Sequence, residues 1–174
     1  MANILIKHAR VVNEGSIVEA DVLIEETRIK KIAKSIKAPQ GVEIIEAMGK
    51  HLLPGMIDDQ VHFREPGLTH KGEIKTESAA AVVGGITTYM EMPNTNPPTT
   101  DAEALEAKYQ LAAQKSMANF AFYFGAANDN LEAIKSLDPK SACGIKIFMG
   151  ASTGNMLVND PHIVTGKQIG RAHV

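Results

Sequence analysis

Side chains that could bind a metal and an anion follow an apolar stretch near residue 60. Residues 53–67 read LPGMIDDQVHFREPG. The imidazole of His62 is a potential zinc ligand, and the planar guanidinium of Arg64 suits a carboxylate. Because side chains alternate along a strand, positions 60, 62 and 64 are expected to share one face. The pattern predicts a metal site beside an anion site at the carboxyl end of this strand.

Two later segments carry polar side chains in the same kind of position. Asn94 follows the apolar run 86–92, and Lys146 is the only charged residue in 144–150, which reads GIKIFMG. A lysine cation inside a barrel is costly unless it is paired or neutralised. Structural roles stay open as alternatives: Lys146 could extend to solvent, and Asn94 could be a turn residue between prolines. Arg64 could pair with a nearby acid, either Glu65 or Asp59.

Positioning these residues requires two kinds of architecture along the chain. Residues 1–50 contain short β-rich segments separated by turn signals, which predict the first part of a small β-sandwich. From residue 51 to about 160, strands alternate with helices, which favours a parallel sheet covered by helices. The expected strands are 52–63, 86–92, 120–124 and 144–150, and the expected helices are 72–83, a segment capped at Thr100, and 131–137.

These elements amount to about four β/α units. A complete (β/α)8 barrel takes roughly 250 residues, and this chain has 174 with the first fifty spent elsewhere. The predicted fold class is therefore α/β, a partial (β/α)8 TIM barrel preceded by a small β-sandwich domain. Residues 169–174 read IGRAHV and match one reading frame of a common sequencing adapter. We interpret 161–174 as a non-native read-through tail and do not count its histidines as ligands.

The motifs resemble a known family. PGMIDDQVHFREPGLTHK at 54–71, taken together with MPNT at 92–95, is similar to the first strands of dihydroorotases of the amidohydrolase superfamily. The resemblance covers about residues 4–158 and is densest over 53–98. It implies a zinc-dependent cyclic amide hydrolase that interconverts N-carbamoyl-L-aspartate and L-dihydroorotate in de novo pyrimidine synthesis.

The resemblance also implies roles for single residues. His62 would bind one or two zinc ions, Lys146 would bridge them as an N-carboxylysine, and Arg64 and Asn94 would hold the substrate carboxylate. The family usually writes His-x-His, whereas this chain has Gln60 at the first position, and a neutral amide oxygen is a poorer zinc ligand than imidazole. Asp58 would orient a metal ligand without contacting the metal itself.

Other parts of the family's active site lie beyond this chain. The resemblance places the catalytic aspartate after the eighth strand and two more histidine ligands on strands five and six, so no catalytic residue is present. We expect the 174-residue chain alone to be inactive. Two alternatives remain: an allantoinase or hydantoinase type of cyclic amidohydrolase, and a non-catalytic scaffold for aspartate transcarbamoylase, which Gln60 would favour.

Composition limits the classes of partner. The net charge is −2, and no basic cluster indicates nucleic acid or an anionic membrane. No apolar run approaches the roughly 20 residues of a membrane span, and the start lacks a signal-peptide pattern. One cysteine without a partner suits a reducing cytoplasm. We expect a cytoplasmic protein with a small-molecule substrate, and the sequence leaves a homo-oligomer open.

Overall fold

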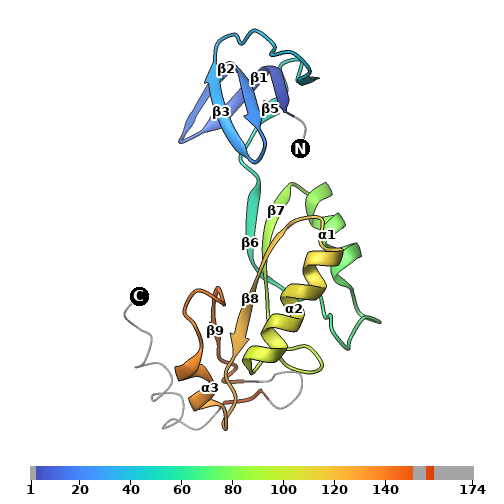
Figure 1. Cartoon of the computed structure of the whole chain (residues 1–174), viewed down its shortest axis with the longest axis vertical. Helices are drawn as coiled ribbons and strands as arrows, with labels where there is room; N and C mark the ends of the chain where they lie inside the picture. The colour runs from blue at the N-terminus through green and yellow to red at the C-terminus, as the bar shows by residue number, and fades with distance from the viewer. Residues whose placement is uncertain (1–2, 151–155, 159–174) are drawn as a thin grey trace. The chain divides into compact units, whose positions relative to one another are not determined.

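The chain divides into two compact units, Met1–Pro54 and Gly55–Val174 (Figure 1). The computed structural model describes residues 3–150 and 156–158. The tail predicted at 161–174 lies outside these described residues.

The first unit is built on one mixed β-sheet. β1 pairs with β2 and β2 with β3 in antiparallel fashion, while β4 and β5 both run parallel to β1. The described residues of this unit form a single sheet, so the second layer of the expected sandwich stays a prediction. The strands are β1 (Ile4–Asn13), β2 (Ser16–Glu25), β3 (Arg28–Ala33), β4 (Glu43–Glu46) and β5 (His51–Leu52).

A bulge in β1 is held by a buried carboxylate. The register of β1 against β2 shifts between Ile6 and Ala9, and His8 adopts a φ of 54° there. Asp21 accepts hydrogen bonds from the backbone N–H groups of His8 and Ile36, both at 2.9 Å. These two bonds lower the pKa of Asp21, so the carboxylate stays charged although it is only 2% exposed. Asp21 thus fixes both the bulge and the segment after β3.

The second unit is a curled parallel sheet in the order β6-β7-β8-β9, a half-barrel with helices along one side. The residues of α1 and α2 pack against β7 and β8, as Figure 1 shows. The alternation of strands and helices predicted from the sequence is confirmed. Its strands are β6 (Met56–Val61), β7 (Ile86–Glu91), β8 (Asn119–Gly125) and β9 (Gly144–Lys146), and its helices are α1 (Ile74–Val83), α2 (Ala102–Lys115) and α3 (Leu131–Ser136).

Three local predictions were wrong. The strand expected at 52–63 is two strands, because β5 joins the first sheet and β6 the second. The fourth strand ends at Lys146 rather than continuing to residue 150. The N-cap of α2 is Asp101 rather than Thr100, because the Asp101 carboxylate accepts the N–H of Ala104 at 2.7 Å.

The main core lies between the second sheet and its helices. Phe63 packs against Tyr89 with 4.4 Å between ring centroids, and Tyr109 of α2 meets Phe122 of β8 edge to face at 4.9 Å. The Tyr89 hydroxyl lies 3.1 Å from the hydroxyl of Ser116, which follows α2. These contacts set the height of α2 over the sheet, and with it the position of side chains at the strand ends.

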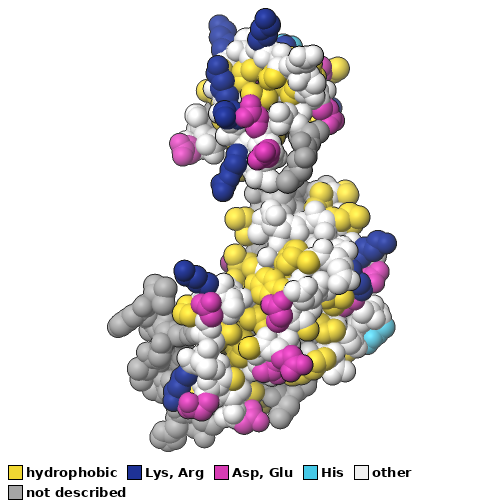
Figure 2. Space-filling model, viewed as in Figure 1, with side chains coloured by type: hydrophobic (Ala, Val, Ile, Leu, Met, Phe, Trp, Pro, Cys, Tyr) yellow, Lys and Arg dark blue, Asp and Glu magenta, His cyan; other side chains and the backbone are white. Residues whose placement is uncertain are grey.

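Hydrophobic side chains are visible on the surface of both units (Figure 2). Among the described residues, no helix combines the length and hydropathy that a bilayer-spanning segment needs. The large exposed apolar residues include Ile17, Val18, Ile29, Ile32, Ile44 and Ile45 in the first unit and Met56, Ile57 and Val83 in the second.

Candidate functional site

The two faces of the second sheet differ in chemistry. Val61 and Phe63 belong to the core beneath the helices, and so do Ile145 and Ile147. Because neighbouring side chains in an extended chain point to opposite faces, His62 and Lys146 lie on the face away from that core. The sheet therefore places a histidine and a lysine, 84 residues apart in sequence, on the same face.

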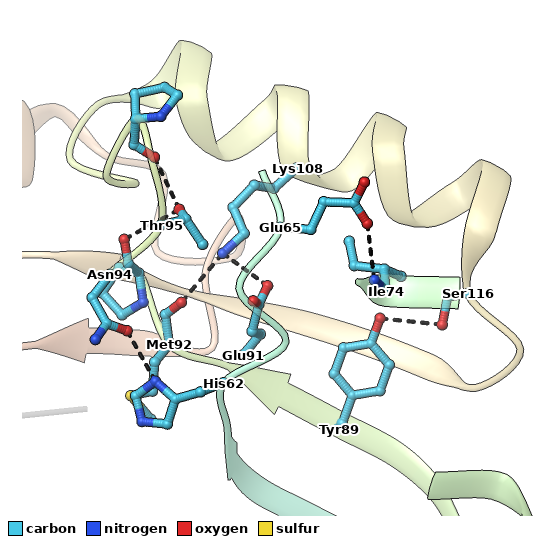
Figure 3. Close-up of polar contacts among 12 residues, drawn as sticks. His62, Glu65, Ile74, Tyr89, Glu91, Met92, Asn94, Thr95, Lys108 and Ser116 are labelled. Atoms are coloured by element: carbon cyan, nitrogen blue, oxygen red, sulfur yellow. Dashed lines mark hydrogen bonds and ion pairs between the residues drawn. The ribbon is translucent and has the colours of Figure 1, made fainter. Parts of the chain in front are cut away.

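His62 is oriented by Asn94. The Nδ1 atom of His62 lies 3.0 Å from Oδ1 of Asn94, a buried residue in the loop after β7 (Figure 3). An amide oxygen only accepts hydrogen bonds, so this contact puts the imidazole proton on Nδ1. The Nε2 atom then keeps its lone pair and can bind a metal.

The electrostatic surroundings keep His62 neutral. Loss of hydration lowers its pKa below 6.5, and the nearby positive charge of Arg64 lowers it further, although the bond to Asn94 raises it. Lys146 and Lys108 also lower this pKa, so their charges act at the imidazole. A neutral imidazole is the form that a metal requires, and proton competition is weak at neutral pH.

Arg64 follows the end of β6 and has a left-handed backbone conformation. β6 ends at Val61, and Arg64 has a φ of 68°, so strand alternation does not put its side chain on the face predicted for positions 60, 62 and 64. Its Nη1 atom is buried and has no hydrogen-bond partner among the described residues. A guanidinium with an unused buried donor is suited to an anionic ligand.

The neighbouring acid of Arg64 is engaged elsewhere. One carboxylate oxygen of Glu65 accepts the N–H of Ile74 at 2.9 Å, at the start of α1, and the other pairs with Lys115 of α2. Glu65 therefore caps a helix whose own N-cap residue, Glu73, makes no side-chain cap. The alternative in which Arg64 pairs with Glu65 is not what the fold adopts.

Lys146 lies at the end of β9 and is half-buried. Its Nζ atom is 5.1 Å from the ring centroid of Phe148, and its backbone carbonyl accepts the N–H of Ala126 at 2.9 Å. No ion pair joins Lys146 to an acid within the described part of the chain.

Gln60 and Asp58 occupy an irregular part of β6. The pairing with β7 shifts between Asp58 and Val61, so alternation does not carry from His62 back to Gln60. The exposed Gln60 donates its backbone N–H to the Asp58 carboxylate at 3.1 Å. Over residues 3–150 and 156–158, no group of three or more His, Cys, Asp or Glu side chains is arranged to hold a metal.

Sequence reasoning missed a buried ion pair next to this site. Lys108 of α2 and Glu91 of β7 are 1% and 0% exposed, and Nζ lies 2.9 Å from Oε2 (Figure 3). The signal was available, since Lys108 falls on the same helical stripe as Leu105 and Ala112, which are buried. A lysine on an apolar stripe indicates a buried partner.

The fold of the chain is found in solved hydantoinases. L-Hydantoinase (dihydropyrimidinase) from Arthrobacter aurescens matches with a TM-score of 0.88 and 32% identity, over 96% of this chain and 38% of that chain. D-Hydantoinase from Thermus sp. matches with a TM-score of 0.72 and 31% identity, over 90% of this chain and 35% of that one. The fold is thus that of hydantoinase-type amidohydrolases.

The sequence relatives identify the family of this chain within the amidohydrolases. A family model described as Dihydro-orotase-like matches residues 49–136, and the chain belongs to this family. A dihydroorotase from Methanosarcina acetivorans is 40% identical over 161 residues, covering 92% of this chain and 34% of the relative. The chain spans about a third of the length of the curated relatives it matches.

Proposed function

We propose that this chain is the N-terminal part of a dihydroorotase, which interconverts N-carbamoyl-L-aspartate and L-dihydroorotate in pyrimidine synthesis. The observation that carries the proposal is the arrangement at the strand ends. There a neutral His62, oriented by Asn94, lies within the electrostatic reach of Arg64, whose buried Nη1 atom is unpartnered. This arrangement suits a metal beside an anion.

Arg64 and Asn94 would hold the substrate carboxylate. The guanidinium supplies charge and a planar pair of donors. The amide of Asn94 uses its oxygen on His62, so its NH₂ group remains to donate to the same carboxylate. Through Asn94 the anion site and the imidazole are mechanically linked, and a bound carboxylate would sit at a fixed place relative to His62.

The residues present fit zinc in part. His62 offers Nε2, and Lys146 on the same face would serve as an N-carboxylysine, which turns a half-buried cation into an anionic ligand. Gln60 would be at most a weak third ligand. Zinc, one or two ions in the complete site, would supply Lewis acidity towards the ring amide and lower the pKa of a coordinated water.

The remaining site residues would come from further sequence. By the family resemblance, the catalytic aspartate and two histidine ligands lie beyond this chain, in the second half of a (β/α)8 barrel. The exposed apolar residues Met56 and Ile57 on the edge strand β6 support closure by such strands. Those on the first sheet, Ile29 and Ile44 among them, support completion of a β-sandwich. The protein would act in the cytoplasm on a small molecule.

The proposal is tested by assaying the complete protein that contains this chain. We expect zinc-dependent ring closure of N-carbamoyl-L-aspartate, and no turnover above buffer from residues 1–174 alone. Arg64→Lys should lower kcat/KM by about tenfold or more, the effect of losing a charged hydrogen bond. Arg28→Lys, at an exposed arginine, is the matched control and should be neutral. An unaffected Arg64→Lys variant would contradict the substrate role.

Two alternatives make different predictions in the same assay. The 35% identity to the L-hydantoinase of Paenarthrobacter aurescens favours a hydantoinase as the second candidate. Preferential hydrolysis of a hydantoin without a carboxylate substituent would support it. A complete protein that binds no zinc and turns over neither substrate would instead support the non-catalytic scaffold that Gln60 suggests.

A further inference from the structure

The turn that carries Arg64 and the loop that carries Asn94 meet through backbone atoms. The carbonyl of Pro66 accepts the N–H of Asn96 at 3.0 Å. Both of these atoms belong to residues two places after the two residues of the proposed anion site. The bond therefore limits how far the turn and the loop can separate at the site.

Gly67 allows the turn and the loop to approach this closely. It lies within the turn, which is closed by a bond from the N–H of Leu68 to the carbonyl of Arg64 at 3.0 Å. Its φ of 83° is in the left-handed region that favours glycine. A Cβ atom at this position would lie 2.6 Å from the Cβ of Asn96 and closer still to its carbonyl oxygen. Because non-bonded carbon atoms pack best at about 3.5–4.0 Å, any other residue would force the turn and the loop apart.

Glu65 prevents the turn from retreating towards the helices. Its side chain is buried, and its carboxylate accepts the N–H of Ile74 at 2.9 Å and pairs with Lys115. The turn is thus anchored to both α1 and α2. Repulsion created at Gly67 would therefore be relieved mainly by displacement of the loop on its other side.

The loop that carries Asn94 is tied together internally. The carbonyl of Pro93 accepts the N–H groups of Thr95 and Thr99, both at 2.9 Å. Asn94 lies between residues that share these bonds. A displacement of Asn96 is therefore expected to carry Asn94 with it.

We propose that Gly67 is a positioning residue for the candidate site: the absence of a side chain there sets the separation of Arg64 and Asn94. The inference rests on the proposed function for the ligand, a substrate carboxylate held by this pair. The contact between the turn and the loop stands without it. Gly67 need not touch the substrate, because it acts through the backbone on either side.

Gly67→Ala in the complete protein tests this role, and Gly85→Ala is its matched control. Gly85 also has a positive φ, 90°, but a Cβ atom there would meet only the end of the Met56 side chain, at 3.9 Å. Both alanines carry backbone strain, and only the first presses on a neighbouring loop.

The kinetic readout is the Michaelis constant. We expect KM for N-carbamoyl-L-aspartate to rise about tenfold or more in Gly67→Ala, as for the loss of a charged hydrogen bond. The kcat should change little, because contacts to the carboxylate act in the ground state and the transition state alike. Gly85→Ala should keep the wild-type KM.

Amide hydrogen exchange gives a readout that needs no substrate. Within 94–98 the exchangeable backbone amides are those of residues 94, 95 and 96, because residues 97 and 98 are prolines. We expect exchange of this segment in the complete protein to accelerate roughly fivefold or more in Gly67→Ala, the factor for one lost backbone bond. It should stay at the wild-type rate in Gly85→Ala.

Wild-type exchange of 94–98 in Gly67→Ala would overturn the proposal, and so would equal acceleration in Gly85→Ala. In an active protein, a loss confined to kcat would contradict it as well. If Gly67→Ala does not fold, the unmodified protein decides: the amide of Asn96 should be protected as that of Met92 is, which donates to Val61 at 3.0 Å. Unprotected exchange would contradict the inference. A complete protein without activity would refute the proposed function, and exchange would still decide this inference.

Discussion

Asp21 in the first unit and Glu91 in the second are both buried carboxylates on β-strands, yet their surroundings differ. Asp21 has one backbone N–H on each oxygen, both at 2.9 Å, and these bonds lower its pKa. Glu91 faces a lysine, and burial raises its pKa while that of Lys108 is lowered for the same reason. Each partner's charge opposes these shifts.

The difference indicates two uses of a buried acid. Asp21 is satisfied by the backbone of its own unit, so it works as a local clamp on a bulge. Glu91 depends on a side chain from another layer, so its state depends on how α2 sits on the sheet. A clamp of the first kind stabilises one unit, whereas the Glu91–Lys108 pair connects α2 to the end of β7.

Breaking the pair in the second unit should have the largest effect. Lys108→Met alone leaves Glu91 buried without a counter-charge, and we expect the free energy of unfolding to fall by about 3–5 kcal/mol. All three tyrosines of the sequence lie in this unit, at positions 89, 109 and 123, so tyrosine fluorescence in a urea titration reports it. The double variant Glu91→Met/Lys108→Met should recover much of the loss, because it leaves no buried unpaired charge. A loss below about 1 kcal/mol in Lys108→Met would mean that the buried pair contributes no more than a surface ion pair.

The clamp in the first unit should be the next most sensitive. Asp21→Asn replaces one of two acceptor oxygens with a donor group that faces a backbone N–H. We expect a loss of about 1–3 kcal/mol, the cost of one unsatisfied buried donor. Resolved amide signals of β1 and β2 during urea unfolding provide the measurement. Glu19→Gln, exposed on the same strand, should leave the midpoint unchanged.

An exposed carboxylate that accepts a backbone N–H, as Asp21 does, should contribute less to the free energy of unfolding. Asp101 accepts the N–H of Ala104 at the start of α2, where water can replace it. Asp101→Ala should cost about 1 kcal/mol by tyrosine fluorescence, and Asp101→Ser should restore most of it. A loss as large as that of Asp21→Asn would mean that burial does not set the strength of such caps.

The smallest expected effect is a pH dependence that separates the two acids. The folded state holds the pKa of Asp21 below its ordinary value of 3.8, so the unfolded chain binds the proton more tightly. The contribution of Asp21 is therefore complete above pH 3.8 and is lost as the pH falls through the lower, folded pKa. The first unit of Asp21→Asn should lose less stability over that window than the wild type. Equal slopes would contradict the charged state of Asp21.

Much of the second unit follows from local pattern. The runs at 86–92 and 120–124 are apolar enough to predict strands buried beneath helices, and β7 and β8 lie there. The prediction was less accurate at 52–63, where Pro54-Gly55 interrupts the run and its two sides join different sheets. The cap of α2 was displaced by one residue, since Thr100 and Asp101 are both good N-caps and only the backbone decides.

The sequence by itself determined which residues could form the site: His62 and Lys146 alternate with core residues, and this alternation is local. Tertiary structure alone decided their partners. His62 meets Asn94 across 32 residues, Glu65 turns away from Arg64 to cap α1, and Lys108 reaches Glu91 from another layer. Periodicity fixes the face on which a side chain lies, whereas its partner depends on where separate strands end and how a helix packs over them.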